Sequence, residues 1–423
     1  MPPRATYSVC PTCLQRIPAQ RVSIGREIFL HKTCPDHGSF ETILWRGHRD
    51  LEEWVGPEGT PLTEPPCPEA CGLCPGHLQQ TCCVLLEVTQ RCNLNCRFCF
   101  AGGAGAGEPS FQQIQAWLVQ LAVPGKTLVQ LSGGEPTLRD DLPEIVAAAK
   151  QAGCRYVQLN TNGLRLAEDE PYVKALAEAG LSFVFLQFDG TEDAIYEQLR
   201  GRPLLRIKQR AIEACAARNI GVTLVPTLVP GINIGNIGAI LRFGIAQAPA
   251  VRGVHFQPVS HFWHRPADEM RFTLDELLLE IDRQAGNLVK AEQLLPSRCD
   301  HPLCGFHGDF LVAQDGQLVP LSQPKQPGTA CCCSPATADQ NRAFVARRWL
   351  RPQDWDGSLG GTDLRDMDTF LRRVQTHGFT ITAMAFQDAG NLDLERLRRC
   401  SLHVFDQGRF VPFCAYYLSE WEP

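Results

Sequence analysis

Three cysteines in one short segment have the spacing of ligands for an iron–sulfur cluster. Cys92, Cys96 and Cys99 form a Cys-x3-Cys-x2-Cys pattern directly after an apolar run at residues 84–89. Three close thiolates suit three irons of a 4Fe–4S cluster, whereas four would normally complete its coordination. The fourth iron keeps an open position, which a catalytic metal site requires. A zinc site completed by a distant residue is the alternative, and the spacing and the place after a strand favour the cluster.

The remaining cysteines are also expected to be metal ligands. The chain has 20 cysteines in 423 residues, most of them toward its two ends. The N-terminus lacks the basic start and apolar run of a secretory signal. No apolar stretch reaches the ~18 residues of a membrane span. A cytoplasmic location is therefore expected, where cysteines more often bind metals or react than form disulfides. The net charge of −6 argues against a nucleic-acid partner.

The elements that must position the triplet alternate along the middle of the chain. Apolar, β-branched runs predict strands at residues 84–89, 127–132, 156–160, 182–189, 221–229 and 253–258. Helical patterns lie between them at residues 110–122, 142–152, 171–179, 206–218 and 237–247. Such a repeat predicts an α/β fold with a parallel sheet, curved into a partial (β/α)6 TIM-like barrel. Functional loops are expected at the carboxyl ends of its strands.

The triplet, with the aromatic Phe98 beside its last cysteine, resembles the signature of the radical SAM superfamily. The resemblance implies that S-adenosylmethionine (SAM) chelates the open iron and that one electron from the cluster splits its sulfonium bond. The resulting 5′-deoxyadenosyl radical then abstracts hydrogen from the substrate. In such an enzyme the cofactors perform the difficult chemistry, and the protein supplies placement and exclusion of water.

Short polar motifs at the ends of the next four strands resemble the segments that hold SAM in this superfamily. Glycine backbone permits close approach of a ligand, and a glutamate can accept a hydrogen bond from an ammonium group. Each motif alone is a weak signal, but together they follow successive strands. The residues that the resemblance assigns to SAM contacts are Phe98, Gly133, Gly134, Glu135, Asn160, Asn162, Gln187, Asp189, Val229 and Gly231.

Cysteine patterns outside the middle of the chain narrow the resemblance. Cys10-x2-Cys13 followed by Cys34 and His37 is typical of tetrahedral zinc or of a mononuclear rubredoxin-like iron. Together with Cys71-x2-Cys74, residues 256–260, Cys400-x2-His403 and residues 412–416, this pattern resembles the archaeal tetraether lipid synthases and the class D radical SAM methyltransferases that act on pterins. The narrower group implies auxiliary 4Fe–4S clusters and a rubredoxin-like iron beside the catalytic cluster.

The expected auxiliary ligands lie in two flanking regions. Three regions are predicted: 1–80, Cys-rich and metal-binding; 81–295, the radical SAM barrel; and 296–423, a Cys-containing auxiliary iron–sulfur region. Cys154 and Cys215 end helical patterns and are expected to be buried structural thiols. The auxiliary ligands are expected to be Cys10, Cys13, Cys34, Cys67, Cys71, Cys74, Cys82 (or Cys83), Cys299, Cys304, Cys332 (or a neighbour), Cys400 and Cys414.

These observations predict a radical SAM enzyme that forms a C–C bond at an sp3 carbon. Two substrates stay open: a lipid alkyl chain that is coupled, or a pterin-like heterocycle that is methylated. A reductant such as flavodoxin or ferredoxin is the expected partner, and peripheral contact with a membrane is compatible with the sequence. Two other classes are a non-catalytic iron–sulfur carrier or scaffold and a zinc-ribbon adaptor. Neither class needs the SAM-pocket motifs, so catalysis is favoured.

Overall fold

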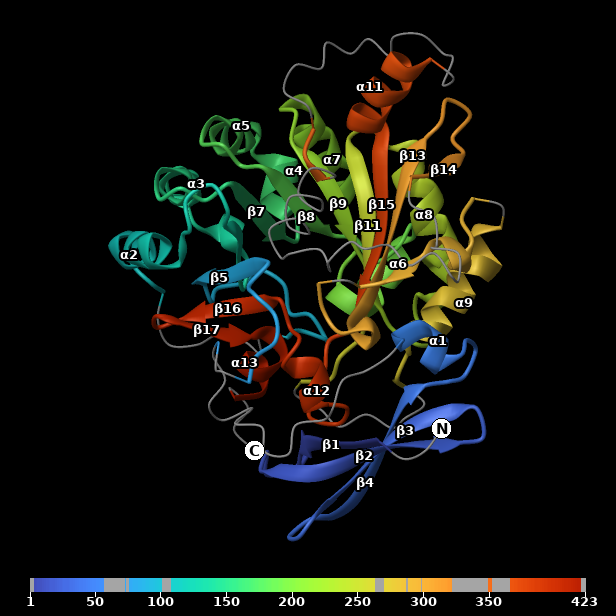
Figure 1. The fold of residues 1–423 in the computed structure, drawn as a ribbon. Helices are drawn as coiled ribbons and strands as arrows, with labels where there is room; N and C mark the ends of the chain where they lie inside the picture. Colours follow the sequence, from blue (N-terminus) through green and yellow to red (C-terminus); the bar gives the residue numbers. More distant parts are fainter. Residues whose placement is uncertain are drawn as a thin grey trace.

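A computed structural model describes residues 4–56, 73, 76–100, 108–262, 270–286, 288–297, 299–321, 349–351 and 366–419. The predicted ligands Cys67, Cys71, Cys74 and Cys332 lie outside these residues. Two sheets organise the described part of the chain, a four-stranded antiparallel sheet near the N-terminus and a large mixed sheet (Figure 1). The mixed sheet positions the cysteine triplet.

Six neighbouring parallel strands form the centre of the large sheet, in the order that the sequence predicts. Their apolar runs are buried nearly throughout, which is typical of parallel strands covered on both faces. The α/β prediction is confirmed, and the pairing path is open, as a partial barrel requires. The strands are β5 (Cys83–Thr89), β6 (Leu128–Gly133), β7 (Tyr156–Thr161), β8 (Phe183–Gln187), β9 (Gly221–Val225) and β11 (Val251–Pro258).

Helices between these strands pack outside the sheet (Figure 1). They include α2 (Phe111–Leu121), α3 (Leu142–Gln151), α5 (Glu170–Glu178), α6 (Asp193–Arg200), α7 (Leu205–Ala217) and α8 (Ile237–Ala246). Ser110 caps α2, because its side chain accepts a hydrogen bond from the Gln113 amide at 3.2 Å. Gly153 and Gly180 follow helix ends with φ of 96° and 94°, a conformation that favours glycine.

The C-terminal region extends both edges of this sheet, which the sequence did not predict. β15 (Gly378–Met384) pairs parallel with β11, and β13 (Gly305–Val312) pairs antiparallel with β15. At the opposite edge, β16 (Leu402–Asp406) pairs parallel with β5, and β17 (Arg409–Pro412) completes a hairpin. Such pairing between distant segments leaves no local pattern in the sequence. The C-terminal region therefore builds part of the barrel wall as well as carrying cysteines.

The N-terminal sheet is fastened to the C-terminal region. It contains β1 (Arg4–Val9), β2 (Arg16–Ile24), β3 (Glu27–Cys34) and β4 (Gly38–Trp45). Asp393, at the start of α12 (Leu394–Leu397), is fully buried; it accepts hydrogen bonds from Arg21 Nε at 2.7 Å and from Thr6 Oγ1 at 2.7 Å. Lys32 Nζ also donates to the Ala389 carbonyl at 2.6 Å. A buried ion pair of this kind is costly to break, so the two ends of the chain form one unit.

Candidate active site

The cysteine triplet lies in the loop after β5. The thiols of Cys92, Cys96 and Cys99 line one cavity at the carboxyl ends of the parallel strands, and this cavity has a volume of about 600 Å³. Partial burial raises the pKa of Cys92, and Glu135, Cys96 and Cys99 raise it further. Metal ions oppose these effects because a coordinating thiol is deprotonated outright. The loop therefore gathers three thiols where iron would stabilise their charge.

Glu135 joins the ends of two strands. It is buried, and its Oε1 accepts from Thr137 N at 3.1 Å, Thr137 Oγ1 at 2.6 Å and Thr161 Oγ1 at 2.7 Å. Its Oε2 accepts from the Asn162 amide at 2.7 Å. Four donors satisfy most of the acceptor capacity of a carboxylate. Glu135 thus organises the strand ends, and it also lines the cavity. The contact to the SAM ammonium that the sequence predicts stays a prediction.

Gly133 and Gly134 lie against the triplet loop. A Cβ atom at Gly133 would approach the Thr89 carbonyl oxygen to 2.0 Å, and one at Gly134 would approach the Arg91 carbonyl oxygen to 2.2 Å. The Gly134 amide also donates to the Thr89 carbonyl at 2.8 Å. The sequence explained these glycines by close approach of a ligand. In the structure they are required by close approach of the chain's own backbone, and both also line the cavity.

Asn162 connects the end of β7 to the triplet loop. Its Nδ2 donates to Asn93 Oδ1 at 2.7 Å, and its Oδ1 accepts from the Leu164 amide at 3.0 Å. Asn160 also lines the cavity, where its Oδ1 accepts from Gln158 Nε2 at 2.7 Å. Both predicted asparagines therefore face the space next to the triplet.

A buried charged network supports the end of β8. Lys208 on α7 is fully buried and donates from Nζ to the Asn162 carbonyl at 2.5 Å and to Gln187 Oε1 at 2.9 Å. Burial lowers the pKa of Lys208 to about 7, although nearby Asp189 raises it. Gln187 Nε2 in turn donates to Asp189. This network fixes the amide of Gln187, one of the predicted contacts.

Arg200 reaches the cavity and Asp189 supports it from behind. Asp189 has no exposed surface; its carboxylate accepts from Arg200 Nε and Nη2, both at 2.8 Å, and from the Thr227 amide at 3.1 Å. Arg200, at the end of α6, lines the cavity, whereas Asp189 does not. Sequence reasoning missed Arg200 because a single arginine near a helix end has no diagnostic spacing. Among the described residues that line the cavity, this guanidinium brings a positive charge to the space beside the triplet.

The remaining predicted contacts divide between cavity and core. The Phe98 ring lines the cavity and lies edge-on to His261, with ring centroids 5.8 Å apart. Val229 is fully buried beneath Phe98, and its amide donates to Asn233 Oδ1 at 2.7 Å. Gly231 has φ of 77° and forms the following turn. Neither Val229 nor Gly231 is among the described residues that line the cavity.

Two further groups of thiols lie on the side of the cavity near β16. Cys299 and Cys82 interact, and this interaction with burial raises the pKa of Cys299 well above its usual range. Cys83 accepts a hydrogen bond from Gln130 Nε2 at 2.7 Å, so the barrel wall holds it. Cys82, Cys83 and Cys299 all line the large cavity. Of the adjacent pair, Cys82 is thus the better candidate ligand beside Cys299.

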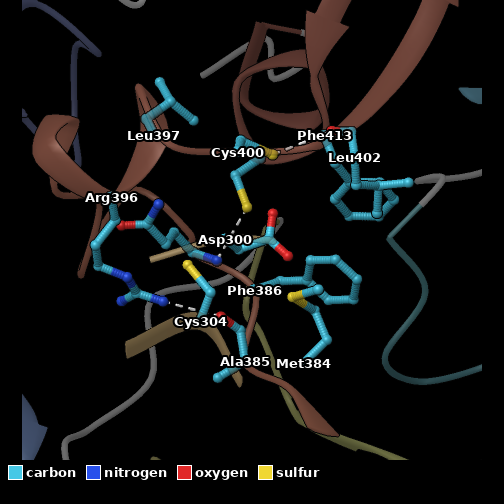
Figure 2. Close-up of a pocket in the computed structure, with 12 residues that line it drawn as sticks. Asp300, Cys304, Met384, Ala385, Phe386, Arg396, Leu397, Cys400, Leu402 and Phe413 are labelled. Carbon is cyan, nitrogen blue, oxygen red and sulfur yellow. Dashed lines mark hydrogen bonds between the residues drawn. The ribbon is translucent and has the colours of Figure 1, made fainter. Parts of the chain in front are cut away.

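The second group surrounds a small buried space (Figure 2). Figure 2 shows the sulfurs of Cys304 and Cys400 directed toward the same space, next to the carboxylate of Asp300. Cys414 also lines this space. Burial raises the pKa of Cys414 to about 12, with a smaller contribution from Cys304. As anions, these three thiols would repel one another and the nearby carboxylate, so a bound cationic centre is what would stabilise them.

The N-terminal sheet gathers the predicted zinc-type ligands. One candidate ligand atom from each of Cys10, Cys13, Cys34 and His37 lies within 4.8 Å of the others. His37 Nδ1 is 3.7 Å from Cys10 Sγ and 3.4 Å from Cys34 Sγ, which places the histidine as the fourth member. Burial raises the pKa of Cys10, but amide donors at Cys13 and Thr12 lower it to about 7. This quartet matches a tetrahedral metal site.

We expect Cys34→Ala to remove the metal of this quartet and leave the other centres loaded. Structural zinc contributes folding free energy directly, so the melting temperature should fall by more than about 5 °C. Metal analysis and thermal unfolding of the anaerobic holoprotein measure both effects. His31→Ala is the matched control, because His31 lies on the same strand and pairs with Glu41 at the surface. Equal metal content in both variants would contradict the assignment.

Comparison with known proteins agrees with both metal-binding regions. Residues 86–244 match the radical SAM superfamily, and residues 2–46 match the HMPTM N-terminal zinc ribbon domain. A 7,8-dihydro-6-hydroxymethylpterin dimethyltransferase from Methanocaldococcus jannaschii is 33% identical, over 98% of this chain and 93% of that protein. An Fe-coproporphyrin III synthase from Methanosarcina barkeri is 31% identical, over 49% of this chain and 50% of that protein.

One solved structure is similar to about half of the chain. The structure of native anSMEcpe with bound AdoMet and the Kp18Cys peptide has a TM-score of 0.41 and 18% identity, over 48% of this chain and 59% of that chain.

In the part of the chain that the structure describes, none of the helices has both the length and the apolar character needed to span a membrane.

Proposed function

Since this chain belongs to the radical SAM superfamily and to the family of the pterin dimethyltransferase that it matches over nearly its full length, we propose that it attaches a one-carbon unit to a carbon of a pterin-like heterocycle. It is a radical SAM enzyme, methyltransferase-like, with a 4Fe–4S cluster and SAM as cofactors. When bound, these cofactors supply the reductive cleavage of SAM and the hydrogen abstraction that begins C–C bond formation.

The residues of the cavity fit these cofactors. Cys92, Cys96 and Cys99 would hold three irons, and the cavity beside them accommodates SAM. Arg200 is the residue that we assign to the SAM carboxylate, because it brings a positive charge to the cavity and its geometry is fixed by Asp189. The chain thereby orients SAM through a guanidinium held by a buried carboxylate.

Polar groups on the barrel wall support a heterocycle over an alkyl chain. The cavity is lined by amides of Gln130, Asn160 and Gln257 and by imidazoles of His255 and His307. Gln130, Asn160 and His255 already bond to protein groups. The ring nitrogens and oxygens of a pterin can use the remaining donor and acceptor capacity of this wall, whereas an alkyl chain cannot. The match to the pterin dimethyltransferase over nearly the full length is the observation that carries the choice of substrate, and these polar groups are consistent with it.

We assign the cysteines of the C-terminal side to auxiliary iron–sulfur centres. Cys82 and Cys299 would ligate one centre at the cavity wall, and Cys304, Cys400 and Cys414 would ligate another behind it. The first position borders the substrate space, and the second lies in an adjoining space, since Asp300, Leu402 and Phe413 line both. A flavodoxin- or ferredoxin-type reductant could pass electrons inward through such centres.

Substrate-triggered SAM cleavage tests this function. The anaerobic, iron-loaded enzyme is incubated with dithionite, SAM, a methylenetetrahydrofolate donor and 7,8-dihydro-6-hydroxymethylpterin. We expect 5′-deoxyadenosine release to rise at least about tenfold with the pterin, and mass spectrometry to find one-carbon adducts of the pterin. If a long-chain lipid gives this response and the pterin gives none, the heterocycle assignment is wrong.

A further inference from the structure

One wall of the cavity is built from strands outside the part of the chain that matches the radical SAM superfamily. That match ends at residue 244, whereas β11, β13 and β15 lie after it. The strand register places His255, Thr382 and His307 in one row across β11, β15 and β13. The strands that match the superfamily thus form the opposite wall of the cavity. The wall built from β11, β13 and β15 is where residues particular to this chain can select the substrate.

Asp309 lies in the next row of the same wall. It pairs in register with Thr380, lines the cavity, and is only 2% exposed. An ionised carboxylate has about four acceptor sites on its two oxygens, so it can accept from a ligand as well as from protein groups. When a ligand with two adjacent N–H groups enters the cavity, a carboxylate is the protein group that matches both donors at once.

The surroundings of Asp309 suit a flat aromatic ligand. Trp349 donates from Nε1 to Thr380 Oγ1 at 3.1 Å, and its ring centroid is 4.7 Å from that of Phe185, which also lines the cavity. His255 is held by a 2.8 Å hydrogen bond between its Nδ1 and Thr382 Oγ1. Burial lowers the pKa of His255 to about 4, so its imidazole is neutral at pH 7. Aromatic faces and neutral polar groups therefore surround the carboxylate.

We propose that Asp309 is the specificity-determining residue that binds the 2-amino-4-oxopyrimidine edge of the substrate. Each carboxylate oxygen accepts from one of two adjacent donors, the ring N3–H and the 2-amino group. The inference rests on the proposed function, and it names the part of the heterocycle that the site recognises. A ring with a 2-oxo group in place of the 2-amino group offers an acceptor to this carboxylate and is rejected.

A specificity exchange tests the proposal. Equilibrium dialysis of the anaerobic holoenzyme with SAM compares 7,8-dihydro-6-hydroxymethylpterin with its 2-oxo analogue, the corresponding dihydrolumazine. The wild-type enzyme should prefer the pterin by about 10- to 100-fold, the discrimination that one bidentate pair typically gives. Asp309→Asn should reverse the preference, because a carboxamide accepts from N3–H and donates to the 2-oxo group.

Controls separate this inference from the proposed function. Asp315→Asn changes an exposed aspartate in the turn after β13 and should leave the preference unaltered. All variants must match the wild type in iron content and SAM binding. If Asp309→Asn does not fold, Asp309→Ala is tested in its place, and it should bind the two compounds without discrimination. If the wild type binds the pterin but Asp309→Asn and Asp309→Ala both keep its preference, only the role of Asp309 is wrong. If the wild type binds neither compound, the proposed function fails, and the role of Asp309 fails with it.

Discussion

Replacing Cys96 with alanine is expected to abolish the formation of 5′-deoxyadenosine from SAM. A 4Fe–4S cluster with one open iron needs three thiolate ligands, and this variant keeps only two. No 5′-deoxyadenosine should therefore be detected. Anaerobic assays with dithionite and SAM, read by chromatography, measure the product. Iron and sulfide should fall by the content of one cluster, while the remainder stays bound at the auxiliary centres.

Cys215→Ala is the matched control for that experiment. Cys215 lies on α7 in the hydrophobic core, where burial raises its pKa to about 12 and keeps the thiol neutral. This variant should retain the wild-type metal content and activity. If an iron-replete Cys96→Ala preparation is as active as the wild type, the triplet is not the catalytic centre. If metal analysis of the protein finds zinc in place of iron throughout, the auxiliary clusters are excluded.

Glu135→Gln is expected to weaken SAM binding by about 10- to 100-fold. The NH2 group of the carboxamide would face some of the groups that now donate hydrogen bonds to Glu135. The backbone amide of Asn162 can only donate, so it could not form a hydrogen bond with this NH2 group. Losing a hydrogen bond to a charged group costs about 1.5–3 kcal/mol, and here it loosens the ends of β6 and β7 together. Isothermal titration of the cluster-loaded enzyme with SAM measures the change.

A surface carboxylate provides the comparison for Glu135. Glu170→Gln removes a 2.7 Å ion pair with Arg218 at an exposed position on α5, and such pairs contribute about 0–1 kcal/mol. SAM affinity should therefore be unchanged in this variant. If Glu135→Gln binds SAM as the wild type does, the hydrogen bonds of Glu135 do not organise the pocket.

The central strands and the triplet could be predicted because both leave local patterns in the sequence. Apolar runs at short intervals fixed the order of β5 through β11, and the intervals between Cys92, Cys96 and Cys99 indicated a cluster. Nothing local indicates that β16 pairs with β5 or that β13 and β15 extend β11. These pairings join segments that are distant in the sequence: Leu402 pairs with Cys83, 319 residues earlier, and Thr380 pairs with Gly253, 127 residues earlier.

Single polar residues were also beyond sequence reasoning. Arg200, Lys208 and Asp309 have no motif, and their importance comes from burial next to the cavity. Asp189 was assigned to the SAM pocket, but its carboxylate is directed to Arg200. A pattern of residue types can locate the end of a strand, whereas the direction of each side chain depends on neighbours contributed by other elements.

The pairing of β5 with β16 sets an order of events during biosynthesis. β5 leaves the ribosome long before β16 is translated, and until then its edge in the growing sheet has no partner. Unpaired strand edges of this kind favour aggregation of nascent chains. Cys400 and Cys414 are also translated long after Cys304, so the centre that we assign to these three cysteines cannot be completed before β16 and the residues that follow it have been made.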